Sequence, residues 1–339
     1  MFTQQQATST AAPLDEPLVS VIVCTLNERN HIAALLEGVL EQQGVPGTLE
    51  ILVADGGSTD GTIEIVAGYA DRNVRLLENE HRFAVHGFNL AARAARGRYL
   101  AFLGAHARYG PRYLADCLAL LQRTGAGNVG GVIEHAGEGT TGRAIALAMS
   151  LPLTLGAPKF RNAKRETECE SVMGGFLERS LFDRLGGFNE TNIVNQDGEF
   201  NYRLRKAGYR IVVSPEIRST YFGRSNPRAL WRQYFRYGYY RRWTEVQHPG
   251  SVPLRVYAPA TLIAVSATCL LTALATNALW PLVPVAAYGA VLIGASVMAL
   301  RTEEPAVAVQ IAPIIATMHA AYGIGWLTGL FRHRRPPTA

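Results

Sequence analysis

The pattern of hydrophobic and polar positions divides the 339-residue chain near residue 255. Before that point, short β-branched runs alternate with segments whose apolar residues recur at helical spacing. The run at residues 19–24, for example, is followed by Ile32, Leu35, Leu36 and Val39. Further runs at residues 49–54, 74–77 and 99–103 complete a predicted β-α-β-α-β-α-β series. Strands that alternate with helices form a parallel sheet covered on both faces, so this part is predicted to be α/β.

Three polar clusters follow these predicted strands, at residues 25–28, 55–60 and 104–106. Ligands of parallel sheets bind beyond the carboxyl ends of the strands, so the clusters predict a ligand site at one sheet edge. Within the second cluster, Asp60 is a natural N-cap for the next helix. Residues 24–29 contain no glycine and the chain has no P-loop lysine motif, which excludes a Rossmann dehydrogenase turn and a P-loop. A bound diphosphate would therefore need a metal ion or basic side chains.

Beyond residue 255 the chain carries three apolar stretches, at residues 256–276, 281–300 and 306–331. Each has at least the roughly 20 residues needed to cross a bilayer, and together they predict a membrane domain over residues 255–331. Buried helices of a soluble protein are the alternative. Three spans after a cytosolic domain would place Arg332, Arg334 and Arg335 outside, against the positive-inside tendency. Either the third stretch is re-entrant or this chain breaks the tendency.

Residues 226–254 are predicted to be an interfacial helix and a linker. Arg228, Arg232 and Arg236 fall on one helical face, and Trp231 and Phe235 fall on another. Rings at headgroup level and guanidinium groups toward phosphates are typical of a helix lying on a membrane. Such a pattern also occurs in single-stranded nucleic acid binding, but the apolar stretch that follows favours the membrane, and no nucleic acid partner is expected.

Composition narrows the class further. The chain is 48% hydrophobic and only 18% charged, with most charges before residue 255, which excludes intrinsic disorder, collagen-like repeats and an all-membrane transporter. Residues 1–17 are polar and predict a disordered leader, not a signal peptide. The four cysteines have no paired spacing and indicate reduced thiols in a cytosolic compartment. The net charge of +6 suits anionic headgroups or phosphates.

Residues 20–28 and 53–61 resemble the opening of the family-2 inverting glycosyltransferases. Residues 104–109, 195–208 and 232–238 are similar to the succinoglycan-biosynthesis ExoA-type branch of that family. The resemblance covers roughly residues 18–330. It implies a GT-A fold (Rossmann-like, with a mostly parallel sheet) over residues 18–225, followed by the transmembrane helices. It also implies a nucleotide-diphosphate sugar donor and a lipid-linked exopolysaccharide precursor as acceptor.

The resemblance also implies which residues bind the donor: Thr25, Asn27, Glu28, Asp55 and Ala105. Asp55 would accept a hydrogen bond from the uracil imide, or it would only cap a turn. Glu28 would contact the donor or stabilise a helix N-terminus. Two single residues, Arg82 and Asn89, also fall in the donor region of the family.

The metal site departs from the family pattern. Relatives carry an Asp-x-Asp motif, or Asp-Ala-His in the ExoA-type branch, whose oxygens hold Mg²⁺ or Mn²⁺ against the diphosphate. This chain has Gly104, Ala105 and His106 there, so the first acid is missing. We expect His106 to be the remaining protein ligand, and a structural histidine is the alternative.

Asp197 is the predicted catalytic base, because displacement at the anomeric carbon requires a group that removes the proton of the acceptor hydroxyl. A helix cap is the alternative for Asp197, and Glu199 is the reserve candidate for the base. On the acceptor side, the resemblance implies contacts from Gly175 and diphosphate contacts from Gln233 and Arg236. Tyr237 stands where relatives carry tryptophan.

These inferences predict a multi-pass protein of the inner (plasma) membrane with a cytosolic catalytic domain. It would move a hexose from a nucleotide-diphosphate sugar, with UDP as the expected nucleotide, to a saccharide linked to polyprenyl diphosphate. Two alternatives stay open. One is a membrane-tethered GT-A binding or scaffold protein that lost turnover, which Gly104 favours. The other is a transferase that uses polyprenyl phosphate itself as the acceptor.

Overall fold

The computed structural model describes residues 17–154, 163–223 and 225–331. The predicted leader therefore lies outside the described residues, apart from Pro17 at its end. The three arginines of the basic tail, at positions 332, 334 and 335, lie outside them as well.

The first elements follow the predicted order: β1 (Val19–Thr25), α1 (Ile32–Leu40), β2 (Leu49–Asp55), α2 (Thr62–Ala67), β3 (Val74–Glu78), α3 (Ala84–Ala94) and β4 (Tyr99–Gly104). Strand β1 pairs in parallel with β2 and β4, and β2 pairs in parallel with β3. The register sets Thr25 beside Asp55 and Cys24 beside Gly104. The carboxyl ends of these strands therefore share one sheet edge, as the pattern predicted.

The sheet continues with strands that the pattern did not predict. Its order is β3-β2-β1-β4-β8-β6-β9-β5, with β7 paired to β9. The added strands are β5 (Ala107–Tyr109), β6 (Asn128–Ala136), β7 (Thr167–Glu168), β8 (Gly175–Glu178) and β9 (Ile211–Phe222). Strand β8 runs antiparallel to both β4 and β6, so the sheet is mixed. The intervening helices are α4 (Tyr113–Thr124), α5 (Gly139–Ser150), α6 (Arg179–Arg184) and α7 (Gln196–Lys206).

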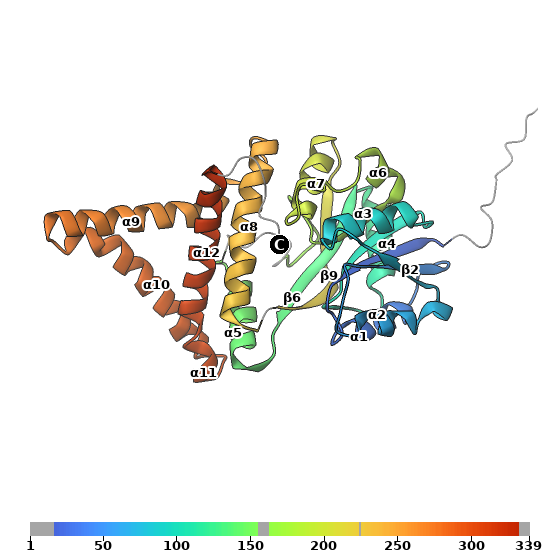
Figure 1. Ribbon diagram of the computed structural model, residues 1–339, viewed down its shortest axis with the longest axis horizontal. Helices are drawn as coiled ribbons and strands as arrows, with labels where there is room; N and C mark the ends of the chain where they lie inside the picture. Colours follow the sequence, from blue (N-terminus) through green and yellow to red (C-terminus); the bar gives the residue numbers. More distant parts are fainter. Residues whose placement is uncertain (1–16, 155–162, 224, 332–339) are drawn as a thin grey trace, which may run out of the picture.

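Successive residues of the central strands pack on opposite faces of the sheet. Val21 and Val23 face α1 and α4, whereas Ile22 faces α3 and α6. Figure 1 shows α1 and α2 on one side of the sheet and α3 and α6 on the other. Both faces are thus covered, which explains why β1, β2 and β4 read as continuous apolar runs.

A buried carboxylate joins the central strands at the opposite sheet edge. Glu50 of β2 is 0% exposed and accepts hydrogen bonds from Ser20 Oγ of β1 (2.6 Å) and from the backbone of Arg96 (2.6 Å) and Gly97 (3.3 Å). Burial raises the pKa of Glu50, but hydrogen bonds from Ser20 and Arg96 outweigh burial and hold its pKa below the ordinary value. This carboxylate ties β1, β2 and the start of β4 together.

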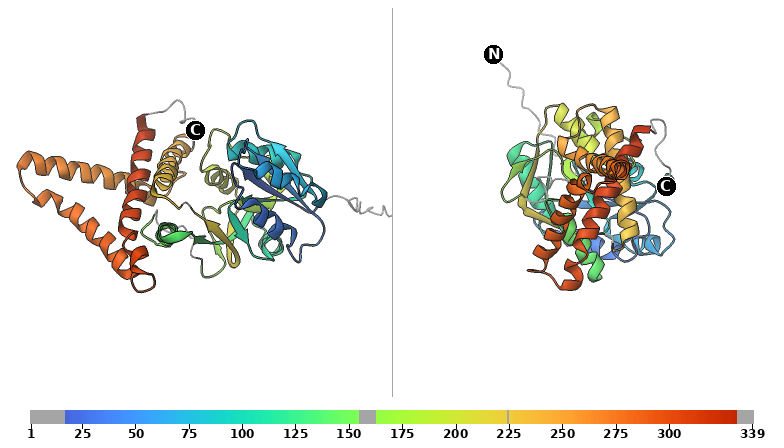
Figure 2. Two further views of the ribbon diagram at one scale, coloured as in Figure 1. Left: turned by 60° about the horizontal axis from the view of Figure 1, so that its bottom comes forward. Right: turned by 90° about the vertical axis from the view of Figure 1, so that its left-hand side faces the viewer.

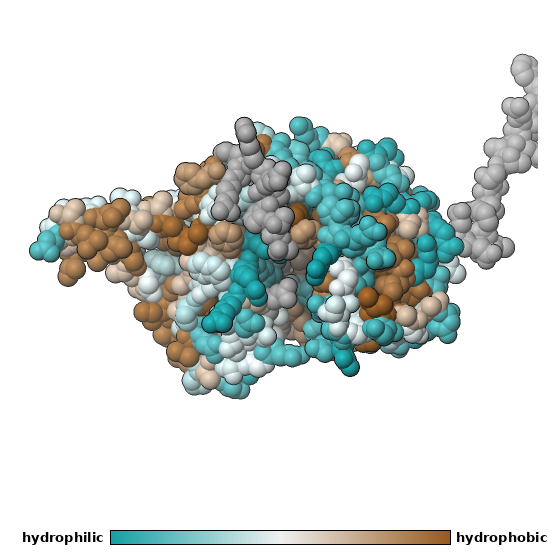
Figure 3. Space-filling view, viewed as in Figure 1, coloured by the Kyte–Doolittle hydropathy of each residue, from teal (hydrophilic) through white to brown (hydrophobic). Residues whose placement is uncertain are grey.

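The C-terminal part consists of helices: α8 (Pro227–Gln247), α9 (Ala258–Thr276), α10 (Val283–Ala299), α11 (Pro305–Ala308) and α12 (Ile311–Phe331). Three segments are long and apolar enough to cross a membrane, Leu254–Thr276, Trp280–Ala299 and Pro305–Phe331. Helices α9 and α10 project from the rest of the protein in Figure 1 and in the left-hand view of Figure 2. Figure 3 shows that this projection carries an extensive hydrophobic surface.

The third segment differs from the other two in its burial. Half of its apolar window is buried within the protein, against 17% for each of the others. It packs against α8 at glycines, where the backbones approach so closely that no side chain fits. A Cβ at Gly238 would overlap the carbonyl oxygen of Tyr322, and a Cβ at Gly325 would overlap that of Phe235. Helices α8 and α12 therefore form one packed unit.

Candidate active site

The Asp55 carboxylate organises the loop after β2. Its Oδ1 atom accepts hydrogen bonds from the backbone N–H groups of Gly57 (2.9 Å) and Ser58 (2.7 Å). Its Oδ2 atom accepts from Thr25 Oγ1 (2.8 Å) and Ser58 Oγ (2.6 Å). The carboxylate is 3% exposed and has four donors, so a uracil imide would have to replace one of the two hydroxyl donors.

The loop after β1 is hydrogen-bonded to the loop after β2. Asn27 adopts a left-handed conformation (φ 58°), which asparagine tolerates better than most residues. Its Oδ1 atom accepts from Thr59 N (2.9 Å), and its own N–H donates to Ser58 Oγ (2.8 Å). The two loops thus hold Thr25, Asn27 and Asp55 together.

Asp60 has the capping role that the sequence predicts, displaced by one residue. Helix α2 begins at Thr62 with Gly61 as its N-cap residue, and Asp60 Oδ1 accepts from both the N–H (3.1 Å) and the hydroxyl (2.6 Å) of Thr62. Hydrogen bonds, first of all from Thr62, lower the pKa of Asp60. Its other oxygen accepts from Arg29 N (3.1 Å), so Asp60 also joins the two loops.

Glu28 and His106 form a pair beside these loops. Glu28 Oε1 lies 3.0 Å from His106 Nδ1, and both residues line a cavity of about 220 Å³ together with Asn27 and Phe222. A carboxylate and an imidazole are suitable ligands for Mn²⁺, so this pair fits a divalent cation. The described part of the chain contains no group of three His, Cys, Asp or Glu that could hold a metal, so further ligands would have to come from a bound substrate.

The neighbours of His106 differ in their access to this cavity. Ala105 is 3% exposed and packs in the core, so only its backbone is available to a donor. A Cβ at Gly104 would lie 3.9 Å from both Ala107 Cβ and Tyr109 Oη, which is ordinary van der Waals contact. Space for a side chain is therefore present at the position of the missing acid.

Asp197 lies in the first turn of α7 and is partly buried. Its Oδ1 atom accepts a hydrogen bond from Gly198 N (2.8 Å). Desolvation raises the pKa of Asp197, while this hydrogen bond and the Arg241 guanidinium oppose the rise. A carboxylate with a raised pKa is better suited to accept a proton than an ordinary one.

Glu199, the reserve candidate, has a structural environment instead. It is 1% exposed and binds Arg203 through both oxygens (2.7 and 2.9 Å). His248 Nε2 lies 2.8 Å from Glu199 Oε1, the atom that also accepts from Arg203 Nε. All these partners belong to the protein, which leaves Asp197 as the more accessible carboxylate of the pair.

The residues predicted on the acceptor side lie in two places. Gly175 begins β8 with φ 114°, and a Cβ there would overlap the Asn128 side chain, so the structure accounts for this glycine by conformation and packing. Gln233 and Arg236 lie on α8, where Gln233 Nε2 donates to Tyr237 Oη (2.9 Å). Their contacts with an acceptor stay predictions.

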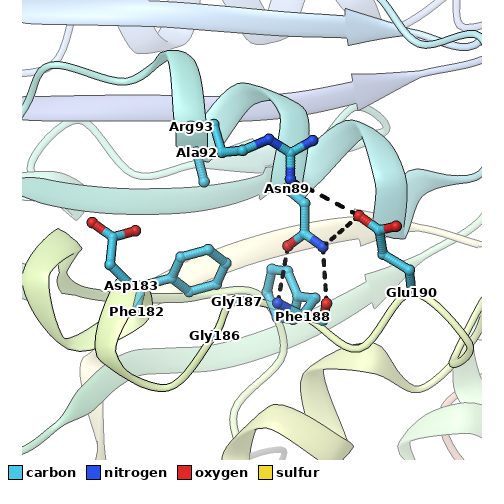
Figure 4. A pocket seen from close by; sticks show the side chains of 9 residues that line it. All are labelled: Asn89, Ala92, Arg93, Phe182, Asp183, Gly186, Gly187, Phe188 and Glu190. Atoms are coloured by element: carbon cyan, nitrogen blue, oxygen red, sulfur yellow. Dashed lines mark hydrogen bonds and ion pairs between the residues drawn. The ribbon is translucent and has the colours of Figure 1, made fainter.

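A second cavity, of about 360 Å³, lies between α3 and the loop that leads toward α7 (Figure 4). Asn89 binds the backbone of Phe188 through both its amide nitrogen (2.8 Å) and its oxygen (2.9 Å), and it also donates to Glu190 Oε1 (3.0 Å). Asn89 therefore holds this loop in place, although its position in the sequence suggested the donor region.

Comparison with known proteins decides the family. The sequence profile described as Glycosyl transferase family 2 matches residues 20–186. The succinoglycan biosynthesis protein ExoA of Rhizobium meliloti (strain 1021) is 31% identical over 317 residues, which are 92% of this chain and 93% of that protein. The chain belongs to glycosyl transferase family 2. As a family-2 protein with glycosyltransferase relatives, it is a glycosyltransferase.

Two further proteins are similar to this chain, one in sequence and one in structure. A dolichyl N-acetyl-alpha-D-glucosaminyl phosphate 3-beta-D-2,3-diacetamido-2,3-dideoxy-beta-D-glucuronosyltransferase of Methanococcus voltae is 29% identical over 230 residues, 65% of this chain and 71% of that protein. The mannosyltransferase PcManGT from Pyrobaculum calidifontis, solved in complex with GDP-Man and Mn²⁺, aligns with a TM-score of 0.63 at 21% identity over 96% of this chain and 91% of its own. This likeness confirms the predicted GT-A fold.

Proposed function

We propose that this family-2 glycosyltransferase moves a hexose from a UDP-sugar to a saccharide linked to polyprenyl diphosphate. The observation that carries the proposal is the meeting of polar groups at the carboxyl ends of β1, β2 and β4, where Thr25 and Asp55 pair in register beside the Glu28–His106 pair. A nucleotide binds at this edge in parallel sheets. A relative that acts on a dolichyl phosphate-linked sugar supports a lipid-linked acceptor.

The donor would occupy the loops after β1 and β2. The uracil imide N–H would replace the Thr25 or Ser58 hydroxyl and donate a charge-assisted hydrogen bond to the Asp55 carboxylate. Asn27 and the backbone of Ala105 would line the same pocket. The diphosphate would then extend toward the 220 Å³ cavity that Glu28 and His106 line.

His106, with Glu28 beside it, would hold Mg²⁺ or Mn²⁺. A divalent cation bound there supplies positive charge for the leaving diphosphate. Because the chain has Gly104 where relatives carry an acid, one protein carboxylate fewer is available, and oxygens of the donor would complete the coordination.

Asp197 would act as the general base. The acceptor oxygen attacks the anomeric carbon, the bond between that carbon and the UDP oxygen breaks, and the hydroxyl proton passes to the Asp197 carboxylate. UDP leaves with the electron pair of the broken bond. A single displacement on an α-linked donor gives a β-linkage.

The acceptor would approach from the membrane along α8. Gln233 and Arg236 would contact its diphosphate, because a guanidinium is a strong partner for phosphate oxygens. Exposed residues such as Leu271 (66%) and Leu274 (71%) on α9 and Ile293 (62%) on α10 would anchor the protein in the inner membrane, with the catalytic domain in the cytosol.

The test is an assay of the purified protein with radiolabelled nucleotide sugars and a membrane lipid extract, with and without Mn²⁺. We expect transfer from a UDP-hexose in the wild type, and its loss by about 10³-fold or more in Asp197→Asn while UDP binding is retained. Asp183→Asn, which changes an exposed carboxylate on α6, is the matched control and should transfer normally. Normal turnover of Asp197→Asn would contradict its role.

The same assay separates the two alternatives. Transfer to polyprenyl phosphate would give a lipid with one sugar, whereas the proposed reaction lengthens an existing saccharide. UDP binding without transfer from any donor would instead support the binding or scaffold protein that the glycine at position 104 favours.

A further inference from the structure

The last turns of α8 form a polar seam with the segment that leads into α7. Asn192 and Asn195 both donate through their side-chain amides to Thr244 Oγ1, at 2.8 and 3.1 Å. Asn192 is 0% exposed and Thr244 is 1% exposed, so these bonds lie inside the protein. His248, the C-cap residue of α8, adds its contact with the buried Glu199 carboxylate. The first turn of α7 is thus held against α8.

Arg241 lies one turn before Thr244, on the same face of α8. Its Nη1 atom lies only 3.2 Å from the position that a Cβ on Gly198 would occupy, so its guanidinium covers the residue after Asp197. The Arg241 side chain also forms a hydrogen bond with the side chain of Tyr322 on α12. Arg241 therefore joins three elements: α8, α12 and the first turn of α7.

Few groups act on the charge of Asp197. Within the described residues, the Gly198 N–H comes from α7 and the Arg241 charge comes from α8, and both favour the ionised carboxylate against desolvation. The other seam partners, Asn192, Asn195 and Thr244, are uncharged. The Glu199 carboxylate is paired with Arg203 and His248. Arg241 is thus the one charged side chain among the groups that favour ionisation of Asp197 within the described residues.

We propose that Arg241 is a positioning residue for Asp197: bound to Tyr322 of α12 and lying over Gly198, it holds the first turn of α7 in place for proton transfer. This inference rests on the proposed role of Asp197 as the base. It assigns the helix pair α8–α12 a part in catalysis as well as in anchoring. The planar guanidinium of arginine has N–H donors for two partners at once. A lysine ammonium keeps the positive charge but lacks this planar arrangement of donors.

The test is the pH dependence of kcat in the full-length protein for Arg241→Met, Arg241→Lys and Tyr322→Phe. A base must be deprotonated, so activity rises with pH through its titration. Loss of the Arg241 charge disfavours the ionised form and moves this acid limb to higher pH. We expect kcat of Arg241→Met to fall about tenfold or more on the acid side and to recover as the pH rises. Arg241→Lys should keep more of the wild-type profile, and Tyr322→Phe should lie between the two.

Arg123→Met is the matched control, because Arg123 is an exposed arginine on α4 that pairs with Glu166 and has no part in the proposed site. Its profile should be that of the wild type. UDP binding and thermal unfolding show whether each variant is folded. An Arg241→Met profile that is lowered uniformly, with its acid limb unmoved, would overturn the inference.

The same measurements in the Asp197→Asn protein distinguish a failure of this inference from a failure of the proposed function. If Asp197 is the base, Arg241→Met should cause no further pH-dependent loss in the Asp197→Asn protein. Normal turnover of Asp197→Asn would contradict the proposed base itself. An inactive Asp197→Asn protein together with a wild-type profile for Arg241→Met would contradict only the role of Arg241.

Discussion

At the scale of single residues, the end of β4 has room for a carboxylate that the chain lacks. A Cβ on Gly104 would meet nothing closer than 3.9 Å, and His106 lies two residues further on. Added negative charge strengthens the binding of hard divalent cations. We therefore predict that Gly104→Asp binds Mn²⁺ about tenfold more tightly in the presence of UDP, as measured by isothermal titration calorimetry.

His106→Ala is the companion variant for this prediction and should weaken the same binding. Equal heats for the wild type, Gly104→Asp and His106→Ala would show that the cation lies elsewhere. Because the readout is binding, the result does not depend on knowing the sugar or the acceptor.

The sequence predicted where the polar loop residues lie better than it predicted their hydrogen-bond partners. Asp55, Asp60 and the Glu28–His106 region all lie where strand order indicated, since a parallel register brings strand ends together. The sequence could not indicate how many hydrogen bonds the rest of the protein makes with each of these side chains. The Thr25 donor to Asp55 and the His248 contact with Glu199 come from segments 30 and 49 residues away along the chain.

At the scale of elements, the buried Glu50 carboxylate of β2 links β1 and the start of β4 to β2 through hydrogen bonds. Glu50→Gln replaces an acceptor with an amide among several donors, so we predict a loss of about 2 kcal/mol in stability at pH 7. Its pKa is lowered in the folded protein, so this stabilisation is present above the unfolded pKa of about 4.3 and is lost as the pH falls through the folded value.

Thermal unfolding at pH 7 and at successively lower pH checks this prediction. The midpoints of the wild type and Glu50→Gln should differ at pH 7 and converge in acid. Glu178→Gln, which removes the partner of Arg98 in a largely exposed ion pair, is the control and should change the midpoint little. A constant difference across the whole range would contradict the argument.

The contact between α8 and α12 depends on glycine. Gly238→Ala places a methyl group against the backbone of Tyr322, so the helices must separate. We predict a lower unfolding temperature and a lower kcat, although alanine is the better helix former by about 1 kcal/mol. Gly289→Ala on α10, where a Cβ would meet nothing within 4 Å, should be neutral or slightly stabilising. Similar behaviour of both variants would argue against this packing.

The strands that alternate with helices were predicted, whereas β5 to β9 were not, although β6 has nine residues and β9 has twelve. The apolar runs that form β1, β2, β3 and β4 are long enough to predict strands that alternate with helices. By contrast, β7 has only two residues and β5 only three. The basic and aromatic pattern of α8 indicated a helix on a membrane surface. It did not indicate α12 as the partner, because helical periodicity shows which face is apolar but not what covers it.

At the scale of the whole molecule, α9 and α10 project together while α12 packs along α8. We therefore predict two membrane crossings, with α12 on the same side as the catalytic domain. The basic residues that follow α12 would then be cytosolic, in agreement with the positive-inside tendency. A reporter fused after residue 339 should be active only in its cytosolic form, and a reporter at the turn after Thr276 only in its external form. The reverse result at residue 339 would indicate three crossings.

The partnership of α8 with α12 also has a consequence for biosynthesis. The ribosome releases α12 after every other described element, so Tyr322 reaches Arg241 only after all of those elements have been synthesised. A nascent chain would already hold a complete nucleotide-binding sheet, yet its proton acceptor would still lack its support. Full sugar-transfer activity would then follow the entry of the hairpin of α9 and α10 into the bilayer, where the lipid acceptor lies.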